Sequence, residues 1–165
     1  MATSHWRPPQ RLSDAAIWAV RRNDYVTLGE LVTISTANTV DESGRPLLTH
    51  IVLHGDVRMV RWMLNLQPLL DRQDQDGWAP LHFAAQQYAM DIAAVLLDAG
   101  ASIDLQDKYG NTPLWRATFE SRGRGDMIRL LLARGADAER ENYSGISPKA
   151  LAHTIANFDV KQFFA

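Results

Sequence analysis

The chain has 165 residues, of which 46% are apolar and 22% are charged, and its 17 basic and 19 acidic residues leave a formal charge of −2. This length suits one compact domain or one short array of repeats, and the near-neutral charge argues against a general nucleic-acid or polyanion binder. The absence of cysteine excludes disulfides, thiol nucleophiles and cysteine-ligated zinc. No apolar run reaches the roughly 18 residues of a membrane span, and the first ten residues lack a secretory h-region. We therefore expect a soluble, cytoplasmic protein.

The first forty residues divide into a polar stretch and a pair of helices. Residues 1–11 contain two consecutive prolines and no apolar cluster, and we expect them to be disordered. Residues 12–40 carry an apolar run at 15–20 and a second apolar group at Leu28, Leu31 and Val32. These two groups predict two short helices that no turn motif precedes.

A four-residue turn motif then recurs along the chain. It reads Asp41-Glu42-Ser43-Gly44 at its first occurrence, and its later copies begin at Asp74, Asp107 and Asn142, so the period is 33 residues twice and then 35. The Asp or Asn side chain is suited to bonding its own backbone, and the glycine accepts the positive φ of a tight turn. We therefore expect the same turn at each of these four places.

Helix starts and ends follow each turn in the same phase. A proline stands shortly after every turn, and Thr112 and Ser147 precede two of these prolines as expected N-caps. Gly100 and Gly135 occupy positions where left-handed C-caps are expected. The first full repeat has Gln67-Pro68 at that position, which predicts a different exit loop. Residues 120–125 include two extra residues and predict a longer, flexible loop.

A 33-residue period with these features resembles the ankyrin repeat, and the run Ala-Pro-Leu-His-Phe-Ala-Ala at 79–85 is close to the signature of that family. The resemblance covers about residues 12–165. It implies an all-α solenoid of helix–turn–helix units with β-turn tips, comprising about three full repeats and two caps. The expected divisions are a cap at 12–40, repeats at 41–73, 74–106 and 107–141, and a cap at 142–165. Such units must stack, because one unit alone cannot bury its apolar face.

The sequence offers little that predicts catalysis or metal binding. The resemblance implies that the imidazole of His82 bonds the backbone of the adjacent turn. His50 and His54 have the i, i+4 spacing of a metal pair, but no third ligand lies at a suitable spacing, so we expect no metal and no cofactor. No nucleophile–base set and no phosphate-binding glycine loop is recognisable, and we expect a protein that is not an enzyme.

Aromatic residues fall into two groups. Trp18 and Trp62 lie on apolar faces, and we expect both to fill the core. Trp78, Tyr109 and Tyr143 fall on the turn tips, and Phe119 falls at the end of an inner helix. Exposed aromatic side chains on successive repeats favour a protein-binding surface. The alternative is that each ring packs against its neighbouring turn.

The resemblance also implies which positions contact a protein partner, because ankyrin arrays bind through their turn tips and inner-helix face. The charge along the turn tips and the inner-helix face is mixed, which favours one specific protein partner over a nucleic acid or a membrane. We expect the protein to be a monomer or to form a 1:1 complex with that partner. The matching positions are Glu42, Ser43, Arg45, Gln75, Asp76, Trp78, Gln86, Gln87, Lys108, Tyr109, Asn111, Phe119, Glu120, Tyr143 and Ser144, with Arg122 and Arg124 of the longer loop at the rim.

A narrower resemblance concerns two segments, residues 110–123 and 155–164. Both are similar to segments of short bacterial ankyrin proteins, many of which resemble immunity proteins encoded beside secreted antibacterial toxins. The leading hypothesis is therefore a cognate immunity protein that binds a toxin domain and blocks its active site. Two alternatives stay open, a general scaffold or regulatory adaptor for a cellular enzyme and a secreted effector that acts on a host.

Overall fold

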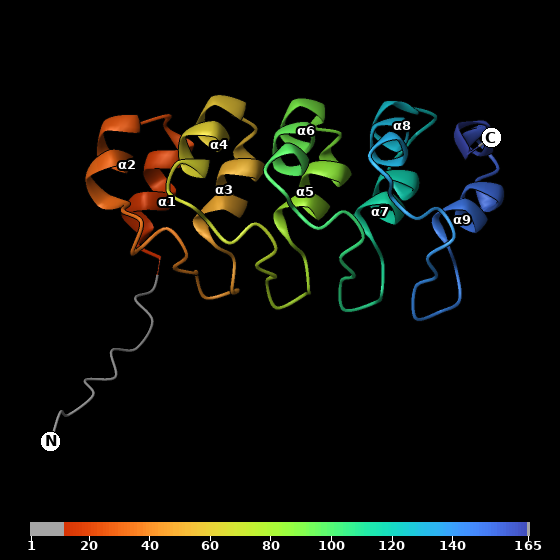
Figure 1. Cartoon of the computed structure of the whole chain (residues 1–165), viewed down its shortest axis with the longest axis horizontal. Coiled ribbons are helices and arrows are strands. Elements are labelled where there is room, and N and C mark those ends of the chain that lie inside the picture. The colour runs from red at the N-terminus through yellow and green to blue at the C-terminus, as the bar shows by residue number, and fades with distance from the viewer. Residues whose placement is uncertain (1–11, 165) are drawn as a thin grey trace, which may run out of the picture.

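The computed structural model describes residues 12–164, so the stretch at 1–11 for which the sequence predicts disorder lies outside the described residues. Short helices are paired and stacked in a row, and the turns project to one side of the stack (Figure 1). This arrangement is the helical repeat solenoid that the sequence predicts. Within the described residues the elements are α1 (Asp14–Arg21), α2 (Tyr25–Leu31), α3 (Leu47–His54), α4 (Val57–Leu64), α5 (Pro80–Gln87), α6 (Met90–Asp98), α7 (Pro113–Phe119), α8 (Asp126–Ala133), α9 (Pro148–Thr154) and a 3-10 helix, η1 (Val160–Phe164).

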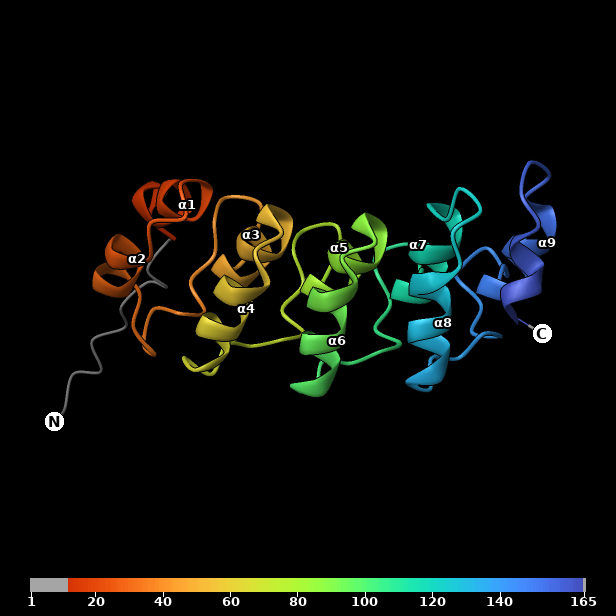
Figure 2. The same ribbon diagram turned by 90° about the horizontal axis from the view of Figure 1, so that it is seen from above.

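The helices form two layers. Helices α1, α3, α5, α7 and α9 lie in one row, the inner helices, and α2, α4, α6 and α8 lie in a second row beside it, the outer helices (Figure 2). Each inner helix contacts the next inner helix along the row, and in the outer row α4 contacts α6 and α6 contacts α8. The core runs continuously between the two layers, with Leu28, Ile51, Leu81 and Leu131 among its fully or almost fully buried side chains. Stacking therefore buries apolar faces that no single repeat covers.

Local hydrogen bonds begin these helices where the sequence predicts. The Thr112 hydroxyl accepts from the backbone N–H of Trp115 at 3.2 Å, and the Ser147 hydroxyl accepts from that of Ala150 at 3.1 Å. Both N-cap predictions are confirmed. Ser13 caps α1 in the same way, at 3.3 Å from the Ala16 nitrogen.

The four turns share one backbone geometry. Gly44, Gly77, Gly110 and Gly145 have φ values of 78°, 77°, 79° and 72°. In the second turn the Asp74 carboxylate accepts from the backbone N–H of Asp76 at 2.9 Å and of Trp78 at 3.0 Å. Successive turns are also joined, because the Asp76 carbonyl accepts from the Lys108 N–H at 3.1 Å. The predicted turn geometry is confirmed.

The exit loop of the first full repeat differs from those of the next two repeats, as the sequence predicts, but only by one backbone hydrogen bond. Gly100 and Gly135 have φ values of 97° and 91°, and Gln67 occupies the same left-handed region at 52°. After each glycine, an alanine N–H bonds back into the preceding helix, as Ala101 does to the Leu96 carbonyl at 3.0 Å. Pro68 has no N–H to donate. The backbone path is therefore kept at Gln67 while one helix-capping hydrogen bond is lost.

The longer loop at 120–125 is held in place and does not project freely. The Tyr88 hydroxyl donates to the carbonyls of Ala117 and Arg124, at 2.7 and 3.0 Å. The Arg124 guanidinium lies 4.0 Å from the centre of the Tyr88 ring. A side chain on Gly125 would meet the Phe163 ring of η1 at 2.5 Å. The predicted flexibility is therefore corrected, since contacts from Tyr88, the C-cap residue of α5, and from η1 hold both sides of the loop.

The two core tryptophan predictions have different outcomes. Trp62 is partly buried and packs against the core. The expectation for Trp18 is wrong, because its side chain is 53% exposed. Ala16, Ala19 and Val20 occupy the buried stripe of α1, and Trp18 lies outside that phase. The Arg22 guanidinium covers one face of the exposed indole at 4.4 Å.

A carboxylate at the start of α4 makes the stability depend on pH. Asp56 caps α4 and also accepts from the Tyr25 hydroxyl at 2.9 Å, and its hydrogen bonds with the Arg58 side chain, Tyr25 and the backbone lower its pKa to about 2. The folded state therefore favours the ionised form, and this stabilisation is present above the ordinary pKa of 3.8 and is lost as the pH falls towards 2. Asp56→Ala should lower the free energy of unfolding by about 1 kcal/mol at pH 7.

Urea denaturation of the wild type and the Asp56→Ala variant tests this expectation at pH 7 and across the range from about 4 to about 2. The difference between the two proteins should shrink as the pH falls. Asp91→Ala is the matched control, because Asp91 is exposed in the first turn of α6. A difference that stays constant over this pH range would contradict the assignment.

Candidate protein-binding surface

A groove lies across the middle turns and the inner helices α5 and α7. Its volume is about 310 Å³. It draws on three successive repeats, because Arg45 precedes α3, Trp78 precedes α5 and Tyr109 lies in the turn before α7. The lining residues are Arg45, Asp74, Asp76, Trp78, Phe83, Gln86, Lys108, Tyr109 and Arg116.

Two aromatic rings in this groove are enclosed by two arginines. The rings of Trp78 and Phe83 are 4.9 Å apart and inclined at 48°. The Arg45 guanidinium lies 5.3 Å from the Phe83 ring, and the Arg116 guanidinium lies 4.2 Å from the Trp78 ring. Cation–π attraction of this kind stabilises both partners and is strongest for Trp. We call these four side chains the aromatic–arginine row.

The row continues along α7 towards the longer loop. The Arg116 guanidinium also lies 5.6 Å from the Trp115 ring. Trp115 stacks on Phe119, with centroids 5.5 Å apart and an angle of 12° between the rings. Since Phe119 is 57% exposed, this end of the row is open to a partner.

Buried carboxylates hold the two arginines in position. Arg116 donates from Nε to Asp107 Oδ2 at 3.2 Å, and its Nη2 bonds the same oxygen. Arg45 donates from Nε to Asp74 Oδ2 at 3.0 Å. Both aspartates are the first residues of their turns and are buried. The turn residue that shapes the backbone therefore also orients the arginine that faces the groove.

The structure brings six of the predicted binding residues together in the groove, namely Arg45, Asp76, Trp78, Gln86, Lys108 and Tyr109. The remaining positions lie along the neighbouring turns and loop. Tyr143 is 74% exposed on the next turn, and Tyr109 is 57% exposed. Gln75 and Gln87 are exposed, and Gln75 donates to the Glu42 carbonyl. Lys108 forms an ion pair with Asp76 between adjacent turn tips. The exposure predicted for Phe119, Tyr109 and Tyr143 is confirmed.

The three predicted binding residues of the longer loop, Glu120, Arg122 and Arg124, differ in their exposure and contacts. Glu120 is half-buried and lies 3.9 Å from the exposed Arg122 guanidinium. The Arg124 side chain is exposed but turns back onto Tyr88. The Arg122 side chain is 78% exposed, so its ion pair with Glu120 leaves it accessible to a partner.

Two predicted positions require correction. Trp78 is half-buried and not an exposed turn-tip residue, because its ring packs against Phe83 and beneath Arg116. Asn111 is 5% exposed. Its side chain bonds Asp107 and, at 2.8 Å, Asn142 of the next turn, so it supports the turns and does not face a partner.

Sequence reasoning missed Phe83, Arg116 and Trp115. A usable signal existed, because Phe83 and Arg116 each stand nine residues after the first residue of a turn, as His50 does after Asp41. His50 bonds Asp41 across this spacing at 2.9 Å, as Arg116 bonds Asp107. In α5 and α7 this position faces the groove.

The histidines at positions 50, 54 and 82 form hydrogen bonds within the protein and have structural roles. His82 is buried, with Nδ1 accepting from the Ala79 N–H at 3.1 Å and Nε2 lying 3.2 Å from the Asn111 carbonyl, which confirms the predicted role. Burial lowers the pKa of His82, which favours the neutral ring. His50 bonds Asp41, and His54 bonds Asn23 at 3.0 Å. No group of three metal-ligating side chains occurs among residues 12–164.

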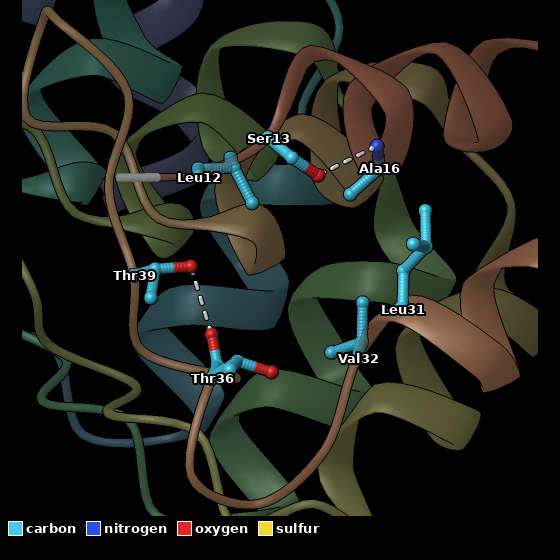
Figure 3. Close-up of a pocket in the computed structure, with 7 residues that line it drawn as sticks. All are labelled: Leu12, Ser13, Ala16, Leu31, Val32, Thr36 and Thr39. Carbon is cyan, nitrogen blue, oxygen red and sulfur yellow. Dashed lines mark hydrogen bonds between the residues drawn. The ribbon is translucent and has the colours of Figure 1, made fainter. Parts of the chain in front are cut away.

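A separate hollow lies in the first helix pair. It has a volume of about 340 Å³, and its seven lining residues come from α1 and the two residues before it, from the end of α2 and from the loop that follows (Figure 3). The Thr39 hydroxyl donates to the Thr36 carbonyl at 2.8 Å at one side, and Ser13 caps α1 at the other. None of the lining residues is charged, so this hollow offers no ionic group to a charged partner.

A sequence profile described as ankyrin repeats (3 copies) matches residues 16–107 and 52–142. The chain belongs to the ankyrin repeat family, whose repeats serve as protein-binding modules. In the part of the chain that the structure describes, no helix has the length and apolar character needed to cross a membrane.

The relatives of the chain are ankyrin-containing proteins of varied kinds. It is 34% identical to the Arabidopsis thaliana serine/threonine-protein kinase VIK over 119 residues, which is 69% of this chain and 27% of the kinase. It is 25% identical to human SH3 and multiple ankyrin repeat domains protein 2 over 147 residues, which is 88% of this chain and 8% of that protein. It is 28% identical to mouse protein phosphatase 1 regulatory subunit 27 over 96 residues, which is 57% of this chain and 62% of the subunit. The chain thus spans less than two thirds of each of these relatives.

Proposed function

We propose that this protein binds one specific protein partner through the groove and the adjoining turn tips. The observation that carries the proposal is the aromatic–arginine row, in which three consecutive repeats contribute rings and guanidinium groups to one surface. Trp, Tyr and Arg are the residue types most enriched in the energetic centres of protein interfaces. The buried aspartates preorganise the two arginines, which reduces the entropy that binding must overcome. The proposal treats residues 12–165 as one binding unit with the repeat divisions given above.

The proposed partner is a bacterial toxin domain, and the protein would act as its cytoplasmic immunity protein by covering the toxin active site. The support is the similarity of residues 110–123 and 155–164 to short bacterial ankyrin proteins of that type. In the fold the two segments meet, because a side chain on Gly123 would lie 2.8 Å from the Phe158 ring. The test is co-expression with the toxin encoded by a neighbouring gene, where the wild-type protein should restore growth.

A regulatory adaptor is the second candidate. Its support is the similarity to protein phosphatase 1 regulatory subunit 27. Affinity capture from the native cell followed by mass spectrometry separates the two candidates, because an adaptor should retain a cellular enzyme in place of a toxin.

Truncation of the groove aromatics tests the surface itself. Trp78→Ala and Tyr109→Ala should each weaken binding of the captured partner by about 2 kcal/mol or more, because each removes an aromatic anchor from the centre of the groove. Isothermal titration calorimetry measures the affinities, and circular dichroism checks that both variants are folded. Val26→Ala is the control, since Val26 is exposed on α2, in the opposite layer. Two folded variants with unchanged affinity would place the interface elsewhere.

A further inference from the structure

We infer that the groove accepts an acidic segment of the protein partner, in which two carboxylate side chains bind Arg45 and Arg116 and an apolar side chain between them packs on Trp78. The inference rests on the proposed function and specifies the chemistry of the partner at that site. It depends on which charged groups of the groove a partner can reach.

The positive and negative charges of the two ion pairs are not equally accessible. The side chains of Asp74 and Asp107 are 2% and 0% exposed, whereas those of Arg45 and Arg116 are 33% and 15% exposed. Each aspartate is committed to its own turn, as Asp107 is through the N–H groups of Tyr109 and Asn111 at 2.8 and 2.9 Å. A partner that enters the groove therefore meets the guanidinium groups and cannot reach the carboxylates behind them.

Each arginine also keeps donors for a partner. Arg45 bonds Asp74 through Nε, and Arg116 bonds Asp107 through Nε and Nη2. Among the described residues no bond occupies the two Nη atoms of Arg45 or the Nη1 atom of Arg116. A guanidinium group forms its strongest hydrogen bonds with carboxylates, and the aromatic ring beneath it keeps its plane fixed. A carboxylate is therefore the ligand that best satisfies these donors.

The order of the row sets the pattern of the segment. Arg45 comes from the first full repeat and Arg116 from the third, and the Trp78 and Phe83 rings of the second repeat lie between them. The two guanidinium groups thus bind different carboxylates. The part of the partner between them crosses aromatic surface, which favours an apolar side chain. The expected pattern is acidic, apolar, acidic.

The remaining charges favour a protein segment over a nucleic acid. Lys108 is paired with Asp76, and the Asp76 carboxylate is exposed at the rim of the groove. A continuous phosphate backbone would meet this carboxylate, and binding it requires an uninterrupted basic surface. Two separate carboxylates need only the two guanidinium groups, and Lys108 offsets the charge of Asp76.

The probe that tests the inference is a phage-displayed library of random peptides about 12 residues long, selected on the full-length protein. Selected peptides should carry Asp or Glu on both sides of an apolar residue. Changing either acidic residue of a selected peptide to its amide should weaken binding about 10-fold, as for the loss of one charge-assisted hydrogen-bond pair. Peptide changes leave the protein untouched, so this readout does not depend on the stability of a variant.

Variants of the protein test whether Arg45 and Arg116 bind the acidic residues of the peptides. The double variants D74N/R45Q and D107N/R116Q remove one groove-lining guanidinium each without leaving an unpaired buried carboxylate. Asn suits these turn positions, because Asn142 forms the last turn. Each should weaken the selected peptides about 10-fold. Arg134→Gln is the matched control, because Arg134 is paired with Asp98 at the ends of the outer helices, and it should leave binding unchanged.

Failure of the inference is distinguishable from failure of the proposed function. If the amide peptides and the double variants bind as tightly as the originals while Trp78→Ala abolishes binding, the groove binds protein but the acidic pattern is wrong. If no peptide is enriched, or if Trp78→Ala has no effect on enriched peptides, the groove is not the interface and both are overturned. Tighter binding of a fluorescein-labelled single-stranded oligonucleotide than of the acidic peptides would overturn the inference in favour of a nucleic acid.

Discussion

Replacing Leu131 with alanine is expected to lower the free energy of unfolding by roughly 2–5 kcal/mol. Leu131 lies on α8 and is fully buried, as Leu96 is on α6, and these two helices contact each other across adjacent repeats. Truncation removes apolar contacts and leaves a cavity at an interface between repeats. Because every repeat depends on its neighbours for burial, the loss should shift the unfolding transition of the whole array and not of one repeat.

Urea denaturation followed by circular dichroism measures this effect for Leu131→Ala and Leu96→Ala. Leu69→Ala is the control, since Leu69 is exposed in the exit loop of the first full repeat, and it should change stability by less than about 0.5 kcal/mol. A loss below about 1 kcal/mol at both buried positions would mean that these leucines do not form the core of the stack.

The second large effect is expected at the contact between two turns. Gly77→Ala should lower the free energy of unfolding by roughly 2–4 kcal/mol, because it combines a strained backbone with a steric clash. Gly77 has φ of 77°, and a Cβ atom there would lie 2.6 Å from the Lys108 backbone nitrogen. The neighbouring atoms are backbone, so the second and third turns would have to separate, and the Asp76–Lys108 backbone hydrogen bond would be lost.

Gly100→Ala separates the two contributions. Gly100 has φ of 97°, but nothing lies within 4 Å of the Cβ position, so this variant has the backbone strain without the clash. Its loss should be about 1–2 kcal/mol. Thermal unfolding monitored by circular dichroism should therefore rank the wild type above Gly100→Ala and Gly100→Ala above Gly77→Ala. Equal losses for the two variants would show that the close approach of the turns contributes nothing to stability.

The features that the sequence predicts correctly depend on contacts between residues close in the chain. The Asp74 carboxylate reaches backbone groups two and four residues away, and the Thr112 hydroxyl reaches one three residues away. Such bonds follow from residue type and spacing alone. The 33-residue period then implies stacking, because each unit has an apolar face that it cannot bury. The class of fold and most of the candidate surface were therefore predictable.

Two of the three errors in predicted exposure, at Trp78 and Asn111, concern side chains that a neighbouring repeat contacts. The apolar run around Trp18 predicts a core side chain, and the turn-tip position of Trp78 predicts an exposed one, yet the phase of α1 leaves Trp18 exposed, and Phe83 and Arg116 cover Trp78. The resemblance to ankyrin repeats implies that Asn111 contacts a partner, but its side chain accepts a hydrogen bond from Asn142 of the next turn and is buried.

By itself, the sequence determined where the turns, caps and repeats of this protein lie, because those features depend on hydrogen bonds within four residues and on a regular apolar period. Only the tertiary structure decided which side chains share the groove. Arg45, Trp78 and Arg116 are more than thirty residues apart along the chain, and they meet because stacked turns hold equivalent positions side by side. When the neighbouring repeat determines whether a side chain is buried, that burial cannot be derived from spacing within the residue's own repeat.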